Sequence, residues 1–180
     1  VKRAEIIREK GTNRSQFFRG MVDKYSWVDI GSSYLMNDVS AAYLWGNLEK
    51  IEEINKDRSR SWERYYWELK SLEEKGFISL PTIPKDCIHN SHMFYLKVKD
   101  LKTRTELLKF LTLNDILAVF HYVPLHSAKA GLNFGEFIGT DQFTTAESER
   151  LIRLPMYYGL EKAEVSYVTN TIKKSYDQTK

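Results

Sequence analysis

The feature that most constrains the fold is a helical pattern that runs from about Asp38 to Lys75. The stretch contains no proline, and Gly46 is its only interior glycine. Asn37 or Asp38 can cap the beginning of a helix here, and Gly76 can end it. Apolar residues recur near helical spacing at Val39, Ala42, Leu48, Ile51, Ile54, Trp62, Tyr65, Tyr66, Leu69 and Leu72. An unbroken helix of this length would measure about 55 Å at 1.5 Å per residue, so we expect a helix, straight or bent, that bridges two parts of the fold.

That helix divides the sequence into residues 1–37 before it, the helix itself at 38–76, and residues 77–180 after it. In the first part, Ala4–Lys10 is typical of the end of a helix that Gly11 closes. Because the sequence also begins without methionine, we expect it to be a piece of a longer chain. The stretch Gly11–Asn37 has no clear period, and a connection of this length is more often functional than a linker. A packed surface loop is the alternative.

The last part of the chain has a mixed α and β pattern. Short apolar runs predict strands at Phe77–Leu80, His92–Val98 and Ile116–Tyr122. Helices are predicted from Thr103, with Glu106 at capping-box spacing, from Thr144 through about Arg153, with Glu147 at the same spacing, and at Glu161–Tyr176.

Composition and charge exclude several classes of function. The net charge is only +3 and the basic residues are interspersed with acidic ones, so nucleic-acid binding is not expected. No run approaches the roughly 18 apolar residues of a membrane span. The first residues lack the apolar segment of a secretory signal. A single cysteine, Cys87, excludes an intramolecular disulfide and fits a reducing compartment, so we expect a cytoplasmic protein with no nucleic-acid or membrane partner.

The densest polar cluster is His121-Tyr122-Val123-Pro124-Leu125-His126. The predicted strand delivers His121 and Tyr122 to its end, and Pro124 fixes a turn that positions His126. Two histidines at a strand end could bind a phosphate, act as acid or base, or ligate a metal. The alternative is a structural role, in which one imidazole only hydrogen-bonds a backbone carbonyl of the turn.

A second polar group, Cys87 with His89 and His92, resembles a metal site only weakly. Its spacing is not a common zinc pattern and no fourth ligand lies nearby, so we expect no metal. Three glycines at intervals of four, Gly131, Gly135 and Gly139, match neither a dinucleotide fingerprint nor a P-loop. From the residues alone, the chain is an α/β protein with a polar site near His121 and in the loop before Asn37.

Four blocks, taken in order, resemble the sugar aminotransferases of the DegT/DnrJ/EryC1 family. They are residues 8–14 with 17–20, residues 29–38 with 41–42, residues 121–126 (HYVPLH) and residues 148–156 (SERLIRLPM). The resemblance implies the C-terminal part of a type I aminotransferase fold that depends on pyridoxal phosphate, with the end of the large domain, the bridging helix and the small domain. It also implies a homodimer.

The first three blocks and the HMFY run are most similar to family members that aminate C4 of dTDP-4-dehydro-6-deoxy-D-glucose with L-glutamate, for cell-surface polysaccharides such as enterobacterial common antigen. The lysine that forms the Schiff base is implied to lie upstream of Val1, so this chain by itself is expected to contain no catalytic residue and to be inactive.

Site residues follow from the same matches. The resemblance implies that Ser33 and Tyr34 contact the cofactor of the partner subunit, where relatives often have asparagine in place of Ser33. It assigns substrate binding to Asn13, Arg14, Arg19, His121, Tyr122 and His126. Two positions depart from the family pattern: Leu35 replaces an arginine, and Lys129 replaces a proline three residues after the second histidine.

Three alternatives stay open. Some family members aminate C3 of a nucleotide-linked ketosugar. Others carry histidine in place of the upstream lysine and act as 3-dehydratases. A non-catalytic dimerisation or interaction module is the alternative from another class.

Overall fold

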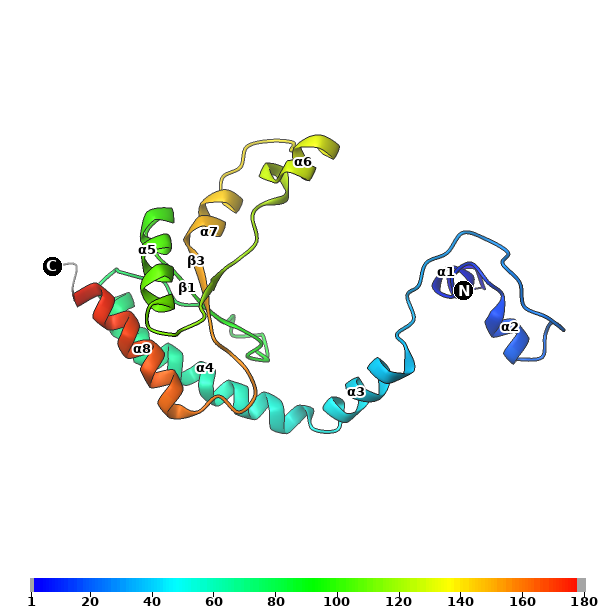
Figure 1. The fold of residues 1–180 in the computed structure, drawn as a ribbon, viewed down its shortest axis with the longest axis horizontal. Helices are drawn as coiled ribbons and strands as arrows, with labels where there is room; N and C mark the ends of the chain where they lie inside the picture. Colours follow the sequence, from blue (N-terminus) through cyan, green and yellow to red (C-terminus); the bar gives the residue numbers. More distant parts are fainter. Residues whose placement is uncertain (1, 178–180) are drawn as a thin grey trace. The chain divides into compact units, whose positions relative to one another are not determined.

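The computed structural model describes residues 2–177 and divides the chain into two compact units, Val1–Ile51 and Glu52–Lys180 (Figure 1). Its helices are α1 Lys2–Arg8, α2 Arg14–Phe18, α3 Asp38–Leu48, α4 Ile51–Glu74, α5 Leu101–Thr112, the 3₁₀ turn η1 Leu125–Ser127, α6 Lys129–Phe134, α7 Thr144–Arg150 and α8 Lys162–Asp177. The strands are β1 Phe94–Lys97, β2 Val119–Phe120 and β3 Leu151–Leu154. None of the helices within residues 2–177 is long and apolar enough to cross a membrane. The predicted three-part division of the chain stays a prediction.

The long helical pattern becomes two helices rather than one. Its predicted ends are confirmed: the Asn37 side chain accepts a hydrogen bond from Ser40 N at 2.9 Å, and Gly76 adopts φ 73° just after α4. Between them, α3 ends at Leu48 and α4 begins at Ile51. Weak helix formers precede the break, since Gly46 adds backbone entropy and Asn47 turns its amide back to Tyr43 O at 2.8 Å.

The sheet of the second unit is antiparallel, with strand order β1-β3-β2. Its central strand, β3, corrects the sequence prediction, which continued the helix from Thr144 through about Arg153. The helix ends at Arg150, and Leu151–Leu154 pairs with both neighbours. Ile152 and Leu154 alternate with less buried residues along β3, and this period of two favours a strand with one face on the core.

The other predicted strands are shorter than expected. His92–Val98 forms β1 over Phe94–Lys97, whereas Ile116–Tyr122 pairs only at Val119–Phe120. Phe77–Leu80 contributes no named strand, only a bridge from Ser79 to Lys97.

The predicted capping boxes at Thr103 and Thr144 do not form: the N-cap residues are Asp100 and Phe143. The α5 cap is Asp100, not Thr103, because the Asp100 carboxylate accepts from Thr103 N and Thr103 Oγ1, both at 2.8 Å. The predicted final helix at Glu161–Tyr176 is confirmed as α8.

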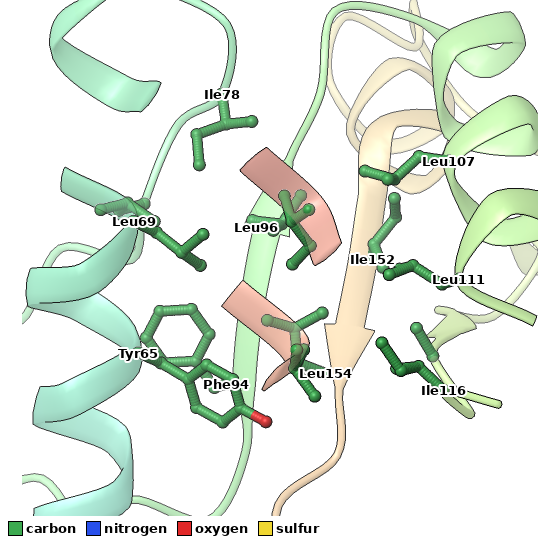
Figure 2. Close-up of a cluster of buried hydrophobic side chains, with 14 of the residues drawn as sticks. Tyr65, Leu69, Ile78, Phe94, Leu96, Leu107, Leu111, Ile116, Ile152 and Leu154 are labelled. Atoms are coloured by element: carbon green, nitrogen blue, oxygen red, sulfur yellow. The ribbon is translucent and has the colours of Figure 1, made fainter. Parts of the chain in front are cut away.

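The hydrophobic core lies in the second unit, between the sheet and its helices (Figure 2). Tyr65 of α4 lies beside Phe94 of β1, Leu69 of α4 points into the same core, and Leu111 of α5 lies beside Ile152 of β3. All five side chains are fully buried. The Tyr65 hydroxyl keeps a partner by donating to Pro155 O at 3.0 Å, and burial raises the pKa of this phenol. This core is the rigid support from which the loop after β2 extends.

Candidate functional site

A hollow of about 770 Å³ opens in the first unit. It is lined by Arg8, Glu9, Lys10, Thr12, Arg14, Phe18, Tyr25, Ser33, Leu35, Met36, Asn37 and Asp38. Three of these residues, Arg8, Lys10 and Arg14, carry positive charge. A hollow of this size with a few converging polar groups is typical of a small-molecule site.

Two glycines next to the lining, Gly11 and Gly31, let two backbone segments approach closely behind this hollow. Gly11, at φ 77°, accepts hydrogen bonds at its carbonyl from Val28 N at 2.7 Å and Asp29 N at 3.0 Å. A Cβ on Gly11 would lie 1.8 Å from Asp29 O, and a Cβ on Gly31 would lie 2.0 Å from Gly11 N. Only glycine allows this crossing, which brings the segment that carries Ser33 against the end of α1.

Glu9, which directly follows α1, is hydrogen-bonded to the beginning of α2. Its carboxylate accepts from Ser15 N at 3.0 Å and from the Ser15 hydroxyl, and it lies 3.3 Å from the Arg8 guanidinium. The hydrogen bond from the Ser15 hydroxyl is the main reason that the pKa of Glu9 is lowered. Arg14 forms no ion pair within residues 2–177, and its guanidinium lies 5.1 Å from the Phe18 ring centre. Its charge is therefore not neutralised by a neighbouring carboxylate.

The five predicted residues of the first unit take different positions. Ser33 and Arg14 both line the hollow. Asn13 instead has a local structural contact, accepting from Ser26 N at 2.7 Å. Arg19 pairs with Glu5 at 2.6 Å, and Tyr34 is 69% exposed and lies outside the hollow's lining. The structure therefore groups two of the five.

In the second unit, His121 directly follows β2, as predicted. Its Nδ1 is buried with no hydrogen-bond partner in the described part of the chain, and its ring centre lies 5.0 Å from that of Tyr122. Ser148 of α7 donates to the Tyr122 carbonyl at 2.7 Å, which holds this segment against α7, whereas the Tyr122 side chain is mostly exposed. The two rings thus differ in access to solvent.

His126 lies in η1, which begins after Pro124 at φ −56°. Its Nε2 is 3.0 Å from Asp141 Oδ2 and 3.4 Å from Thr145 Oγ1, and its ring centre is 4.5 Å from that of Phe137. Helix α6 packs closely on the turn, because a Cβ on Gly131 would lie 1.6 Å from Leu125 O. Among the described residues, no hydrogen bond or ring contact joins His121 and His126. The two imidazoles therefore do not form one paired site.

The partner Asp141 was missed from the sequence. An aspartate three residues before the first residue of a predicted helix often accepts from the backbone of that helix, as Asp141 does from Thr144 N, so this contact could have been predicted. Its contact with His126, fifteen positions earlier, had no local signal.

The weak metal pattern is not assembled by the structure. Cys87 is exposed, and the His89 ring packs edge-on against Trp62 with centres 4.9 Å apart. Burial lowers the pKa of His89. Nowhere between residues 2 and 177 do three His, Cys, Asp or Glu side chains gather as a metal site would require.

Comparison with known proteins places this geometry in a family. The model of the DegT/DnrJ/EryC1/StrS aminotransferase family matches residues 1–173. The chain is 29% identical to the uncharacterized protein MJ1066 of Methanocaldococcus jannaschii, covering 97% of the chain and 46% of that protein. It is 25% identical to the dTDP-3-amino-3,6-dideoxy-alpha-D-galactopyranose transaminase of Aneurinibacillus thermoaerophilus, covering 97% of the chain and 43% of that enzyme. The chain therefore spans less than half the length of these relatives.

Solved structures of sugar aminotransferases also match this chain over part of their length. Spr1654 of Streptococcus pneumoniae, solved in a PLP form, superposes with a TM-score of 0.77 at 19% identity, covering 97% of this chain and 42% of that one. The chain thus has the architecture of part of a pyridoxal-phosphate-dependent aminotransferase, as the sequence predicted, and pyridoxal phosphate is the cofactor of this group of proteins. With its family model matched over nearly its whole length, the chain belongs to the DegT/DnrJ/EryC1/StrS aminotransferase family.

Proposed function

We propose that the protein transfers the amino group of L-glutamate to C4 of dTDP-4-dehydro-6-deoxy-D-glucose, the reaction of dTDP-4-amino-4,6-dideoxygalactose transaminase. We further propose that it acts as a cytoplasmic homodimer in the synthesis of a cell-surface polysaccharide such as enterobacterial common antigen. The observation that carries the reaction class is the family match over residues 1–173. The choice of C4 rests on the sequence blocks at 9–20, 29–38 and 121–126, which resemble the C4 enzymes most.

The hollow of the first unit fits a phosphate-bearing cofactor by the chemistry of its donors. Arg14 is a cation without an ionic partner in the described part of the chain, and Ser33 and Lys10 add a hydroxyl and an ammonium group. Such groups bind phosphate by charge-assisted hydrogen bonds. Ser33 would hold the cofactor phosphate, with the Ser33–Tyr34 segment reaching the site of the partner subunit, and Arg14 beside it would bind the substrate. When bound, pyridoxal phosphate supplies the electron sink for moving an amino group.

The chain's own polar residues would then bind and orient the substrate. Tyr122 and His126 supply side chains at the end of the rigid sheet, and Ser148 fixes the backbone of Tyr122. Neither residue is required as an acid or base, since the family's own lysine moves the proton. Their contribution in this proposal is affinity for the nucleotide sugar.

Amination at C3 is the second candidate, because a curated relative at 25% identity is a dTDP-3-amino sugar transaminase. The two reactions leave nitrogen on different carbons. The protein, at the length its gene encodes, is incubated with pyridoxal phosphate, L-glutamate and either the 4-keto or the 3-keto sugar nucleotide. NMR of the product locates the carbon that bears nitrogen. Nitrogen at C4 supports the proposal, nitrogen at C3 replaces it with the second candidate, and no amino sugar from either substrate rejects both.

A further inference from the structure

The His126 ring has an unusually defined set of neighbours for a residue on a loop. Both atoms near Nε2 are oxygens, Asp141 Oδ2 at 3.0 Å and Thr145 Oγ1 at 3.4 Å. The other ring nitrogen, Nδ1, has no hydrogen-bond partner among residues 2–177. The His126 side chain is 21% exposed. One edge of the ring is therefore held by the protein, and the other has no partner within the described residues.

The direction of the hydrogen bonds decides which nitrogen carries the proton. The Thr145 hydroxyl donates to Asp141 Oδ2, and the backbone N–H groups of Thr144 and Thr145 donate to the same carboxylate. The hydrogen bond from the Thr145 hydroxyl is the main reason that the pKa of Asp141 is lowered, so this group is an ionised acceptor at neutral pH. Because the Thr145 hydrogen points to Asp141, its oxygen can only accept from His126. Two acceptors therefore face Nε2, and a stable arrangement places the hydrogen on Nε2.

We infer that Asp141 is a positioning residue: it fixes neutral His126 as the Nε2–H tautomer and so presents Nδ1 as a hydrogen-bond acceptor for a hydroxyl group of the substrate. A lone pair at Nδ1 accepts from a hydroxyl and repels the oxygens of a diphosphate. His126 thus selects the hexose part of a nucleotide sugar. The identity of that hexose rests on the proposed function, whereas the tautomer of His126 does not.

The same fold contains a matched site without a histidine. Asp100 caps α5 by accepting from Thr103 N and Thr103 Oγ1, and Asp141 likewise accepts from backbone N–H groups in the first turn of α7. Within residues 2–177, Asp100 pairs with no histidine. Capping alone therefore does not require the His126 contact, and Asp100 offers a control for the loss of a capping carboxylate.

The first experiment reads the tautomer directly. Long-range proton–nitrogen NMR of histidine-labelled protein distinguishes a protonated from an unprotonated ring nitrogen, and the wild type is expected to show Nε2–H and bare Nδ1 at His126. In Asp141→Asn the amide oxygen still caps α7, while its NH₂ group faces Nε2 as a donor. His126 is then expected to switch to the Nδ1–H tautomer. Asp100→Asn is expected to leave His126 unchanged. Bare Nε2 in the wild type, or no switch in Asp141→Asn, overturns the inference.

The second experiment identifies what Nδ1 recognises, with dTDP and dTDP-glucose as probes in titration calorimetry on the protein at the length its gene encodes. Asp141→Asn should weaken dTDP-glucose roughly 2- to 10-fold, the range of one neutral hydrogen bond, and leave dTDP unchanged. Equal weakening of both probes would show that His126 serves the diphosphate, and hydroxyl recognition would fail although the proposed function stands. Binding of neither probe to the wild type would reject the nucleotide-sugar function and hydroxyl recognition with it, while the tautomer result holds independently.

Discussion

Replacing Gly11 with alanine should separate the segment at Gly11 from the segment at Val28 and Asp29, whose close approach shapes the hollow of the first unit. The left-handed backbone of Gly11 costs an alanine about 1–2 kcal/mol. The new Cβ would also lie 1.8 Å from Asp29 O, so the two backbone segments must separate and the two hydrogen bonds from Val28 N and Asp29 N to Gly11 O are lost. At about 0.5–1.5 kcal/mol each, these bonds add roughly 1–3 kcal/mol to the cost.

Gly20 provides the matched control, because it has a similar φ of 69° but nothing within 4 Å of its Cβ position. Gly20→Ala should therefore carry the backbone strain without the separation. We expect the amides of Val28 and Asp29 to exchange with deuterium roughly 5- to 150-fold faster in Gly11→Ala than in Gly20→Ala, as follows from 1–3 kcal/mol at 1.4 kcal/mol per decade. Equal exchange in the two variants would refute the claim that close approach at Gly11 shapes the hollow.

Three further predictions concern function and stability. His126→Ala should raise KM for the nucleotide sugar about 2- to 10-fold and leave the glutamate half-reaction unchanged in stopped-flow spectra; collapse of the glutamate half-reaction would instead assign His126 to the cofactor. Mixing a subunit mutated at the catalytic lysine with one mutated in the Ser33–Tyr34 segment should partly restore activity, because a heterodimer contains one intact site; heterodimers without activity would show that the segment does not act in trans. Glu73, whose carboxylate accepts from the Lys70 ammonium at 2.6 Å and from Leu80 N at 2.8 Å, has a lowered pKa, chiefly through Lys70. Its folded-state pKa lies below the unfolded value near 4.5, so its contribution is complete above that pH and is lost as pH falls through the folded pKa. The stability gap between wild type and Glu73→Gln, measured by urea unfolding, should therefore shrink below pH 4.5, and a gap constant down to pH 2 would contradict this role.

Local signals predicted the parts of the fold whose causes are local. Gly76 follows the end of α4, Asn37 caps the beginning of α3, and the amphipathic pattern of α8 was sufficient for its full length. Helix α1, however, ends at Arg8, before the predicted Lys10. The prediction failed at Leu151–Leu154, where a helix pattern beginning at Thr144 was continued too far. Strand β3 forms because Ile152 and Leu154 meet β1 and β2, and those contacts depend on partners distant in sequence.

The candidate sites show the same limit. His121 and His126 were predicted as a polar pair from their shared segment, yet the 3₁₀ turn directs His126 to Asp141 and leaves His121 beside Tyr122. Ser33 and Arg14 were each selected through the family resemblance. Their common hollow depends on the approach of Gly31 to Gly11, which neither residue type nor spacing reveals.

We propose that this chain belongs to an enzyme that moves an amino group from L-glutamate to a nucleotide-linked ketosugar. The most direct measurement is the absorbance spectrum of the protein, at the length its gene encodes, with pyridoxal phosphate bound. Addition of L-glutamate alone should replace the band of the bound aldehyde form with that of the amino form. Subsequent addition of dTDP-4-dehydro-6-deoxy-D-glucose should restore the original band. A spectrum that responds to neither addition, or that responds to glutamate and is not reversed by the ketosugar, would contradict the account.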